Sequence, residues 1–439
     1  MQSAHVLLRD CAGRDLQVLI SRVCAALAVA ALASSYADSA RAAAFLMQEQ
    51  SAKSSGRAYA GDAAIAQDAS TVFYNPAGMT ELSGPQTLAG GYMIKPEAKL
   101  SNRGSTVTGV AVGGRADDQG FDANPLAHFY AATPLDSGLW LGLAVTMPFG
   151  LANKYKSDYF GRYDSIESRI ATVDVAPSIA YAINPQVSIG GGLDVQYIKA
   201  KLAQAIPNPG MLGNPAGDGK FTVKGDDVSL GYNLGVLYKP TDDLRVGLSY
   251  RAAISHDVSG NAVQEFSGTT RKGVTANIDL PDIVGLGAAY RLTPQVTLLA
   301  QGNFYSWNRY DQVTFSYSDG TKSVLEEQFR STFGAAIGAE VAVGGGWNLR
   351  SGLQYDQSPT RDEFRSTSMP DADRVWFSVG ASYAISQNVS FDFSYSHMFA
   401  NKEPINRSTT FTAIATTVLT QGSTETSSDV LGFGLQVAF

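Results

Sequence analysis

The stretch VSFDFSYSHMF, residues 389–399, decides the fold class of this chain of 439 residues. Its odd-numbered positions are valine, phenylalanine, tyrosine or histidine, and its even-numbered positions are serine, aspartate or methionine. Successive side chains of a β-strand point to opposite faces, so this period of two predicts a strand with one apolar face and one small or polar face. The stretches 187–197, 228–238 and 244–254 repeat the pattern.

Alternating segments recur along the chain and predict fourteen strands, joined by connections that are short and long in turn. The expected strands cover residues 87–100, 124–134, 139–149, 167–183, 187–203, 226–240, 244–258, 273–292, 295–317, 328–343, 347–358, 372–385, 389–400 and 427–439. The short connections carry turn residues, as in Asn184-Pro185, whereas the long ones are polar, as in 204–225 and 401–426. This arrangement is typical of outer-membrane barrels. The sequence therefore predicts an all-β transmembrane barrel of fourteen antiparallel strands, over residues 87–439.

Lipid tolerates no unpaired backbone edge, so the last strand is expected to pair with the first. Trp140 and Trp347 follow short turns and are expected at the membrane interface.

The composition agrees with a barrel: charged residues make up only 17% of the chain and no apolar run is long enough for a membrane-spanning helix. A net charge of −7 supplies no basic surface for nucleic acid.

The N-terminus resembles an export signal. An apolar stretch at 23–33 is too short to span a bilayer, and an A-x-A pattern ends at Ala42. We expect a signal peptide over residues 1–42, cleaved between Ala42 and Ala43, with a buried alanine-rich helix as the alternative.

Enzymatic and metal chemistry find little support in the sequence. Both cysteines, Cys11 and Cys24, lie in the expected signal peptide, so the mature chain offers no thiolate for catalysis or for a metal. Its histidines are His128, His256 and His397, and the last two share the parity of apolar, lipid-facing positions. No G-x-S-x-G motif is present. The sequence predicts no enzyme activity, no metal site and no cofactor.

Residues 43–86 show no alternation and are rich in alanine and glycine, with a possible helix over 58–69. A barrel of fourteen strands would enclose a lumen wide enough for water. We expect this segment to plug that lumen, and a disordered periplasmic tail is the alternative.

Several motifs in order along the chain resemble the FadL family of outer-membrane transporters for long-chain fatty acids and other hydrophobic compounds, including toluene and xylene. The motifs are Ala43-Ala44-Phe45, Gly56–Gly61 (GRAYAG), Asn75-Pro76-Ala77, Ser358-Pro359, Pro370–Arg374 (PDADR) and Trp376. The resemblance implies a fourteen-stranded barrel with an N-terminal hatch that carries Asn75, Pro76 and Ala77. It also implies ligand capture between extracellular loops, an inner pocket, and sideways exit into the membrane.

The third strand offers a physical basis for such an exit at Pro148-Phe149-Gly150. Proline has no N–H for the ladder, and glycine tolerates a distorted backbone. A gap in the wall is one reading, and a simple end of the strand at Pro148 is the other. The resemblance favours the gap, since the family's third strand is kinked at the position of Gly150.

The resemblance also points to a ligand pocket lined by Phe45, Leu202, Gln204 and Leu325, with simple hatch packing as the alternative for Phe45. Family members that take fatty acids are expected to carry basic residues where this chain has Gln204 and Leu325. A buried carboxylate without a partner is costly, so these positions favour an uncharged ligand. Three basic residues remain alternative partners for a carboxylate: Lys199, Lys201 and Arg330.

The sequence thus predicts a passive transporter of fatty acids or hydrocarbons in the bacterial outer membrane. It is expected to work as a monomer in contact with membrane lipid and lipopolysaccharide. A general porin and an adhesin are the alternatives.

Overall fold

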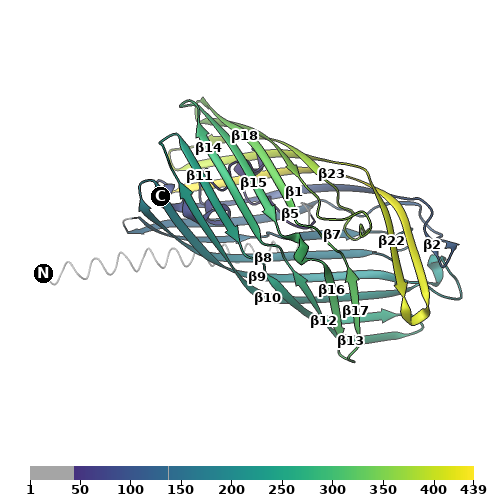
Figure 1. The fold of residues 1–439 in the computed structure, drawn as a ribbon. Coiled ribbons are helices and arrows are strands. Elements are labelled where there is room, and N and C mark those ends of the chain that lie inside the picture. The colour runs from purple at the N-terminus through teal and green to yellow at the C-terminus, as the bar shows by residue number, and fades with distance from the viewer. Residues whose placement is uncertain (1–43, 137) are drawn as a thin grey trace.

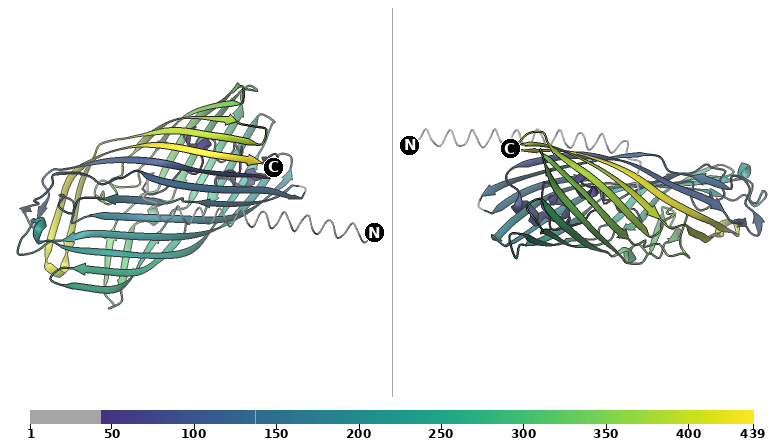
Figure 2. Two further views of the ribbon diagram at one scale, coloured as in Figure 1. Left: turned by 180° about the vertical axis from the view of Figure 1, so that it is seen from behind. Right: turned by 90° about the horizontal axis from the view of Figure 1, so that it is seen from above.

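The computed structural model describes residues 44–136 and 138–439, and the chain forms a closed antiparallel barrel with its N-terminal segment inside (Figures 1 and 2). The wall is crossed fourteen times, as predicted. The helical elements are α2 (Ala52–Ser55), α3 (Thr71–Tyr74), η1 (Pro76–Glu81), η2 (Pro215–Gly217), η3 (Trp307–Arg309) and η4 (Thr412–Ile414). The strands are β1 (Gln86–Asn102), β2 (Thr106–Val107), β3 (Val110–Ala111), β4 (Asp117–Gln119), β5 (Asn124–Asp136), β6 (Leu139–Thr146), β7 (Gly150–Lys154), β8 (Glu167–Asn184), β9 (Val187–Ile206), β10 (Gly219–Tyr238), β11 (Leu244–Arg251), β12 (Ser255–Glu265), β13 (Thr269–Asp279), β14 (Ile283–Arg291), β15 (Val296–Tyr305), β16 (Gln312–Tyr317), β17 (Lys322–Glu326), β18 (Thr332–Gly344), β19 (Trp347–Asp356), β20 (Arg374–Ala384), β21 (Val389–Ala400), β22 (Glu403–Phe411) and β23 (Thr416–Ala438).

The barrel closes between its first and last strands, as expected. β1 pairs with β23 along its whole length, from Gln86 opposite Ala438 to Asn102 opposite Gly422. Every backbone edge at the seam therefore has a partner, which a wall facing lipid requires.

Alternation along the strands sorts the side chains between lipid and lumen. Leu230 is 74% exposed and Phe433 is 42% exposed, whereas Ser394 and Ser396 are fully buried. The apolar face thus points outward and the small or polar face points inward, the reverse of a soluble protein. No helix among the described residues has the length and apolar character needed to cross a membrane.

Four of the expected strands are interrupted. The third stops at Thr146 and resumes at Gly150, and the seventh, eighth and ninth are broken at 252–254, 280–282 and 306–311. The breaks in the third, seventh and eighth strands change the parity of the residues after them, whereas the break in the ninth keeps it. Leu248 is 48% exposed, whereas His256 of the same expected strand is buried, so the lipid-facing position expected for His256 is wrong.

The long connections contain more strand than expected. β10 begins at Gly219, within the expected loop 204–225, and β22 with the start of β23 occupies most of the expected loop 401–426. These extensions form long hairpins at the end of the barrel opposite the C-terminus (Figure 1, where the hairpin of β22 and β23 is yellow).

The N-terminal segment contains only short helical turns, and the expected helix over 58–69 is wrong. Ala58, Tyr59 and Ala66 have positive φ angles, a conformation that ends a right-handed helix. Trp140 also departs from expectation, since it is 7% exposed and packs inward with Val72 and Leu82 of this segment.

Trp347 is 47% exposed and lies against Tyr383, with a ring distance of 4.7 Å, as an interfacial residue would. The expected signal peptide and its cleavage site between Ala42 and Ala43 lie outside the described residues.

Candidate functional site

Residues 44–85, called the hatch below, lie inside the barrel and contact strands around the whole ring (Figure 1). Hatch residues form hydrogen bonds to the wall at Tyr130 of β5, Ser188 of β9, Val236 of β10, Gln301 of β15, Glu340 of β18, Ser396 of β21 and Gln436 of β23. A segment bonded on all sides is held in place, unlike the periplasmic tail that was the alternative.

The Asn75-Pro76-Ala77 motif lies against the wall at β9 and β10. The Asn75 side chain caps η1 by accepting from the Ala77 N–H at 3.1 Å. Its amide donates to the carbonyls of Ala63, at 2.6 Å, and of Val236, at 3.0 Å. One side chain thus joins two parts of the hatch to the barrel.

Inward-facing glycines make room for this contact. A Cβ on Gly190 would lie 2.5 Å from the Ala77 nitrogen, and one on Gly235 would collide with the Asn75 carboxamide oxygen. Gly190 belongs to the triplet 190–192 within β9. Sequence reasoning did not find this role, and the signal for it was a run of glycines inside an alternating strand.

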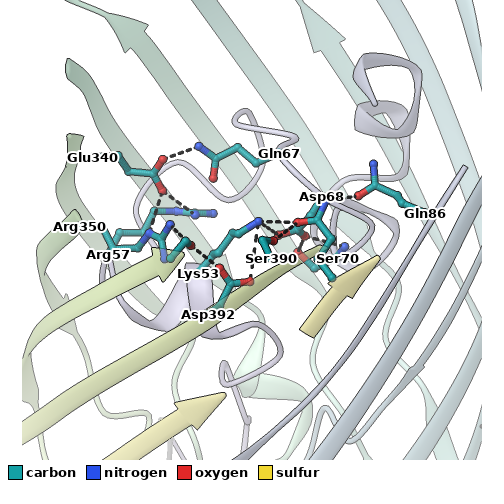
Figure 3. Close-up of polar contacts among 12 residues, drawn as sticks. Lys53, Arg57, Gln67, Asp68, Ser70, Gln86, Glu340, Arg350, Ser390 and Asp392 are labelled. Atoms are coloured by element: carbon teal, nitrogen blue, oxygen red, sulfur yellow. Dashed lines mark hydrogen bonds and ion pairs between the residues drawn. The ribbon is translucent and has the colours of Figure 1, made fainter. Parts of the chain in front are cut away.

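Buried ion pairs join the hatch to the opposite wall (Figure 3). Lys53 lies 3.1 Å from Asp68 of the hatch and 3.8 Å from Asp392 of β21. Arg57 lies 2.8 Å from Asp62 and 3.3 Å from Glu340 of β18, which Arg350 of β19 also approaches at 3.3 Å. These side chains are at most 11% exposed. Removal of one partner would leave a buried charge uncompensated, which is strongly destabilising.

Sequence reasoning missed these ion pairs, although the strand pattern carries a signal for them. Glu340, Arg350 and Asp392 are charged residues at lumen-facing positions, where these strands carry mostly small or uncharged side chains.

The start of the hatch bonds to the interruption in the third strand. Leu46 and Phe149 form an isolated antiparallel bridge. The Met47 N–H donates to the Pro148 carbonyl at 2.8 Å, and the Gly150 N–H donates to the Phe45 carbonyl at 2.7 Å. The strand resumes at β7, so the reading in which Pro148 simply ends the strand is wrong.

Phe45 is the centre of an aromatic cluster beside this interruption. Its ring lies 4.9 Å from Trp307, 5.2 Å from Tyr310 and 6.1 Å from Phe149, and it is fully buried. Phe329 extends the cluster, 5.1 Å from Tyr310. Trp307 and Tyr310 lie in the break of the ninth strand, so the cluster joins two breaks in the wall.

An apolar cavity of about 80 Å³ lies next to the cluster, on the inner face of β7 to β10, β12 and β13. Its apolar lining includes Val223, Val258, Val274, Val313, Phe315 and Met369. Leu202 and Leu325, two of the four expected pocket residues, also line it, whereas Gln204 does not. Phe45 does not line the cavity either, but it packs against Tyr310, which does.

Four basic or acidic residues border the cavity: Arg169, Lys201, Lys224 and Glu327. The three basic residues alternate with inward-facing neighbours, so their side chains belong to the outer face of the wall. The Lys201 ammonium lies 2.6 Å from Glu167, which is on that outer face too. The other expected carboxylate partners, Lys199 and Arg330, do not border the cavity.

Among these four residues, Glu327 is the one whose side chain is buried within the protein. Burial raises the pKa of Glu327 to about 7, although the Arg407 guanidinium 3.7 Å away opposes the shift. The inner wall of the cavity thus presents an acid rather than a base.

The described residues show no arrangement for hydrolysis or metal binding. His256 contacts Asp227 at 2.9 Å and Gln196 at 3.2 Å, and the Ser229 hydroxyl donates to Asp227 rather than to the imidazole. No group of three or more His, Cys, Asp or Glu residues in this part of the chain is placed to hold a metal ion.

A closed barrel with an internal hatch and an apolar cavity defines an outer-membrane transport protein, and the comparisons with known proteins agree. The model of the family described as outer membrane protein transport protein (OMPP1/FadL/TodX) matches residues 33–439, and the chain belongs to this family. The chain is therefore a transporter of hydrophobic compounds in the bacterial outer membrane, and not an enzyme.

The chain is similar to several characterised proteins. It is 30% identical over 423 residues to the long-chain fatty acid transport protein of Escherichia coli O6:H1, an alignment that covers 86% of this chain and 91% of that protein. It is 26% identical over 407 residues to outer membrane protein P1 of Haemophilus influenzae, with coverage of 83% and 88%. The crystal structure of a Pseudomonas aeruginosa FadL homologue superimposes with a TM-score of 0.85 at 21% identity, and covers 90% of this chain and all of that one.

Proposed function

We propose that the chain carries a hydrophobic ligand passively from the cell exterior, through the cavity, to the lipid beside the third strand. The ligand enters between the extracellular loops and occupies the cavity. It leaves sideways through the interruption at Pro148-Phe149-Gly150 when the start of the hatch moves. Asn75, Pro76 and Ala77 hold the rest of the hatch against the wall.

The position of Phe45 carries this proposal. Its ring contacts Tyr310 of the cavity on one side and Phe149 of the interruption on the other. A displacement of this one aromatic side chain would join the two spaces. The hatch start is held to the interruption by the two backbone hydrogen bonds of the bridge between Leu46 and Phe149, and by hydrogen bonds between the Gln50 side chain and the backbone of Met147.

A disulfide tether tests this gate. Leu46 and Phe149 form a non-hydrogen-bonded antiparallel pair, the type in which side chains lie closest and Cβ atoms come within reach of a disulfide. We expect the Leu46→Cys/Phe149→Cys variant to lose ligand uptake when oxidised and to recover it on reduction. The single cysteine variants are the controls. Normal uptake by the oxidised variant would exclude an exit through this interruption.

The cavity favours an uncharged ligand over a carboxylate. Its lining is apolar, and its buried ionisable side chain is the acid Glu327. Some relatives are named for fatty acids and other family members for toluene, so both ligand classes are open to this chain. The inner lining carries no basic side chain, and this disfavours a fatty acid. A carboxylate moved into an apolar site without a partner loses its hydration.

Two probes of similar size test the ligand class: a long-chain fatty acid and its uncharged hydrocarbon analogue. We expect the purified barrel to bind the hydrocarbon more tightly, and the Glu327→Lys variant to gain affinity for the acid. Preference of the unmodified protein for the acid would mean that a basic side chain reaches the ligand after all. Failure to bind either probe, together with steady ion conductance, would favour a general porin.

A further inference from the structure

The outer surface of β8, β9 and β10 carries a row of basic residues for which transport offers no role. Arg169, Lys201 and Lys224 are directly opposite one another in the ladder of these three neighbouring strands. All three belong to the outward-facing set of their strands. Like charges placed directly opposite across strands destabilise a sheet, so the arrangement costs folding energy unless an anion lies between them.

The row lies where the wall leaves the hydrocarbon. Outward positions of β9 and β10 are apolar as far as Tyr197 and Val228, which face each other and are 37% and 60% exposed. The next outward pair is Lys199 with Asp226, and the one after it is Lys201 with Lys224. This end of the barrel bears the long loops, which in outer-membrane barrels are extracellular. The row is therefore at the level of the outer-leaflet headgroups.

Interactions within the protein compensate this surface only in part, and Arg169 has a partner there. Lys201 is 36% exposed and pairs with Glu167, and Lys199 faces Asp226. Lys224 is exposed and forms no ion pair within the residues that the structure describes. Lys154 of β7 adds a further basic residue opposite Glu167. The patch thus holds five basic and two acidic residues in a chain whose net charge is −7.

The opposite side of the barrel is built differently. Lys95 and Lys99 also face outward on β1, but Lys95 lies opposite Asp429 and Lys99 lies opposite Glu425 of β23. Each basic residue there has an acidic neighbour across the seam. Acidic residues thus match the basic ones at this seam, whereas basic residues are in excess in the patch on β7–β10.

We propose that Arg169, Lys201 and Lys224 form a binding site for the phosphate groups of the glycolipid of the outer leaflet, lipopolysaccharide. Phosphates at headgroup level would lie between the three basic side chains, and acyl chains of the same lipid would lie along Tyr197 and Val228. The site is on the outside of the wall, and it does not depend on the route of the transported ligand.

Lipid binding by the purified barrel in an uncharged detergent tests the site, with bound lipid counted by native mass spectrometry. The probes are lipid A with both phosphates, lipid A without phosphates, and inorganic phosphate as a competitor. The test variant is Arg169→Gln/Lys201→Gln/Lys224→Gln, and the matched control is Lys95→Gln/Lys99→Gln/Lys402→Gln, which removes the same charge elsewhere. A second variant, Lys224→Glu, reverses the charge at a position with no ion pair to lose on folding.

Near an anionic lipid surface each basic residue contributes about 1 kcal/mol, so we expect the test variant to bind phosphorylated lipid A about tenfold or more weakly than the unmodified protein. Lys224→Glu should also weaken binding, the control should not, and lipid A without phosphates should bind all four proteins alike. The proposal is overturned if the test variant binds like the unmodified protein, or if the control loses as much. It is also overturned if inorganic phosphate displaces lipid A at equal concentration, because the site would then recognise a free anion.

Discussion

Asn75 and Asn214 begin the same four residues, Asn-Pro-Ala-Gly, in two different surroundings. Each side chain caps a short 3-10 helix by accepting the backbone N–H of the motif's alanine at 3.1 Å. Only Asn75 also donates to the wall, through the Val236 carbonyl, and to the hatch, through the Ala63 carbonyl. The motif therefore makes the local turn, and its surroundings decide whether the turn docks the hatch.

We predict that Asn75→Ala impairs ligand uptake whereas Asn214→Ala does not. Both substitutions lose a cap worth about 1 kcal/mol, but only the first frees the hatch from β10. Uptake of a fluorescent hydrophobic probe by cells, normalised to folded barrel in the membrane, measures the difference. Equal uptake by the two variants would mean that the bond between Asn75 and the wall has no part in transport.

Glu49 makes the docking of the hatch depend on pH. Its carboxyl group is 1% exposed, and burial raises the pKa of Glu49 to about 7, although the Arg374 guanidinium opposes the shift. Burial likewise raises the pKa of Asp62 to about 6. For a carboxyl with a raised pKa, the docked state gains stability below the unfolded pKa of about 4.5 and loses it as pH rises through about 7.

The hatch is accordingly expected to open more readily at pH 8 than at pH 5, by an amount on the order of 3 kcal/mol from Glu49. Hydrogen exchange of hatch amides at the two pH values, corrected for intrinsic rates, measures this. Glu49→Gln should reduce the difference and leave the part due to Asp62, and Glu363→Gln, in an exposed loop, should not change it. A hatch with the same protection at both pH values would contradict the prediction.

At the scale of the element, Asp282 joins the breaks of three neighbouring strands. Its carboxylate accepts from the Tyr250 hydroxyl at 2.6 Å and the Ala253 N–H at 3.1 Å, both of the seventh strand. It also accepts from the Ser306 hydroxyl at 2.9 Å and the Arg309 guanidinium at 2.7 Å, in the break of the ninth. One acidic side chain thus replaces ladder bonds that the breaks remove.

The substitution Asp282→Asn is predicted to loosen these breaks without unfolding the barrel. An amide keeps one acceptor oxygen but cannot pair with the arginine, and charged hydrogen bonds contribute about 1.5–3 kcal/mol each. Faster hydrogen exchange at 252–254 and 306–311 is the expected readout. Asp279→Asn, at the end of β13, is the control. Comparable effects of the two substitutions would show that Asp282 does not specifically stabilise these breaks.

At the scale of the whole molecule, the hatch fills the lumen that a fourteen-stranded barrel encloses, and its bonds run to strands around the ring. The proposed passive transport would be driven by the concentration gradient of the ligand itself.

We predict that proteoliposomes take up a hydrophobic probe to equilibrium without any energy source, and that cells treated with an uncoupler keep the same initial rate. Planar bilayers containing the protein should show little steady conductance of small ions, because ions need an open aqueous lumen. Accumulation above equilibrium or porin-like conductance would each contradict this reading.

Much of the wall could be predicted from the sequence, because a strand between lipid and lumen must alternate at every residue. The stretch 389–399 and the strand 228–238 both lie where the alternation places them. The closure of β1 on β23 follows from the same constraint, since an open edge in lipid is not viable. The low charge content, the turn residues and the loop lengths then indicated an outer-membrane protein.

The sequence by itself thus determined the barrel, its membrane and the family of transporters to which it belongs. Each strand between lipid and lumen must alternate between apolar and polar side chains, and this alternation is visible in the local sequence. Only the tertiary structure decided where Phe45, Phe149 and Tyr310 meet, since they come from three distant segments. It also decided that the breaks turn His256 inward, and that Arg169, Lys201 and Lys224 form one row. Register between strands and the path of the hatch arise from packing between residues far apart in the chain, and no local pattern carries that information.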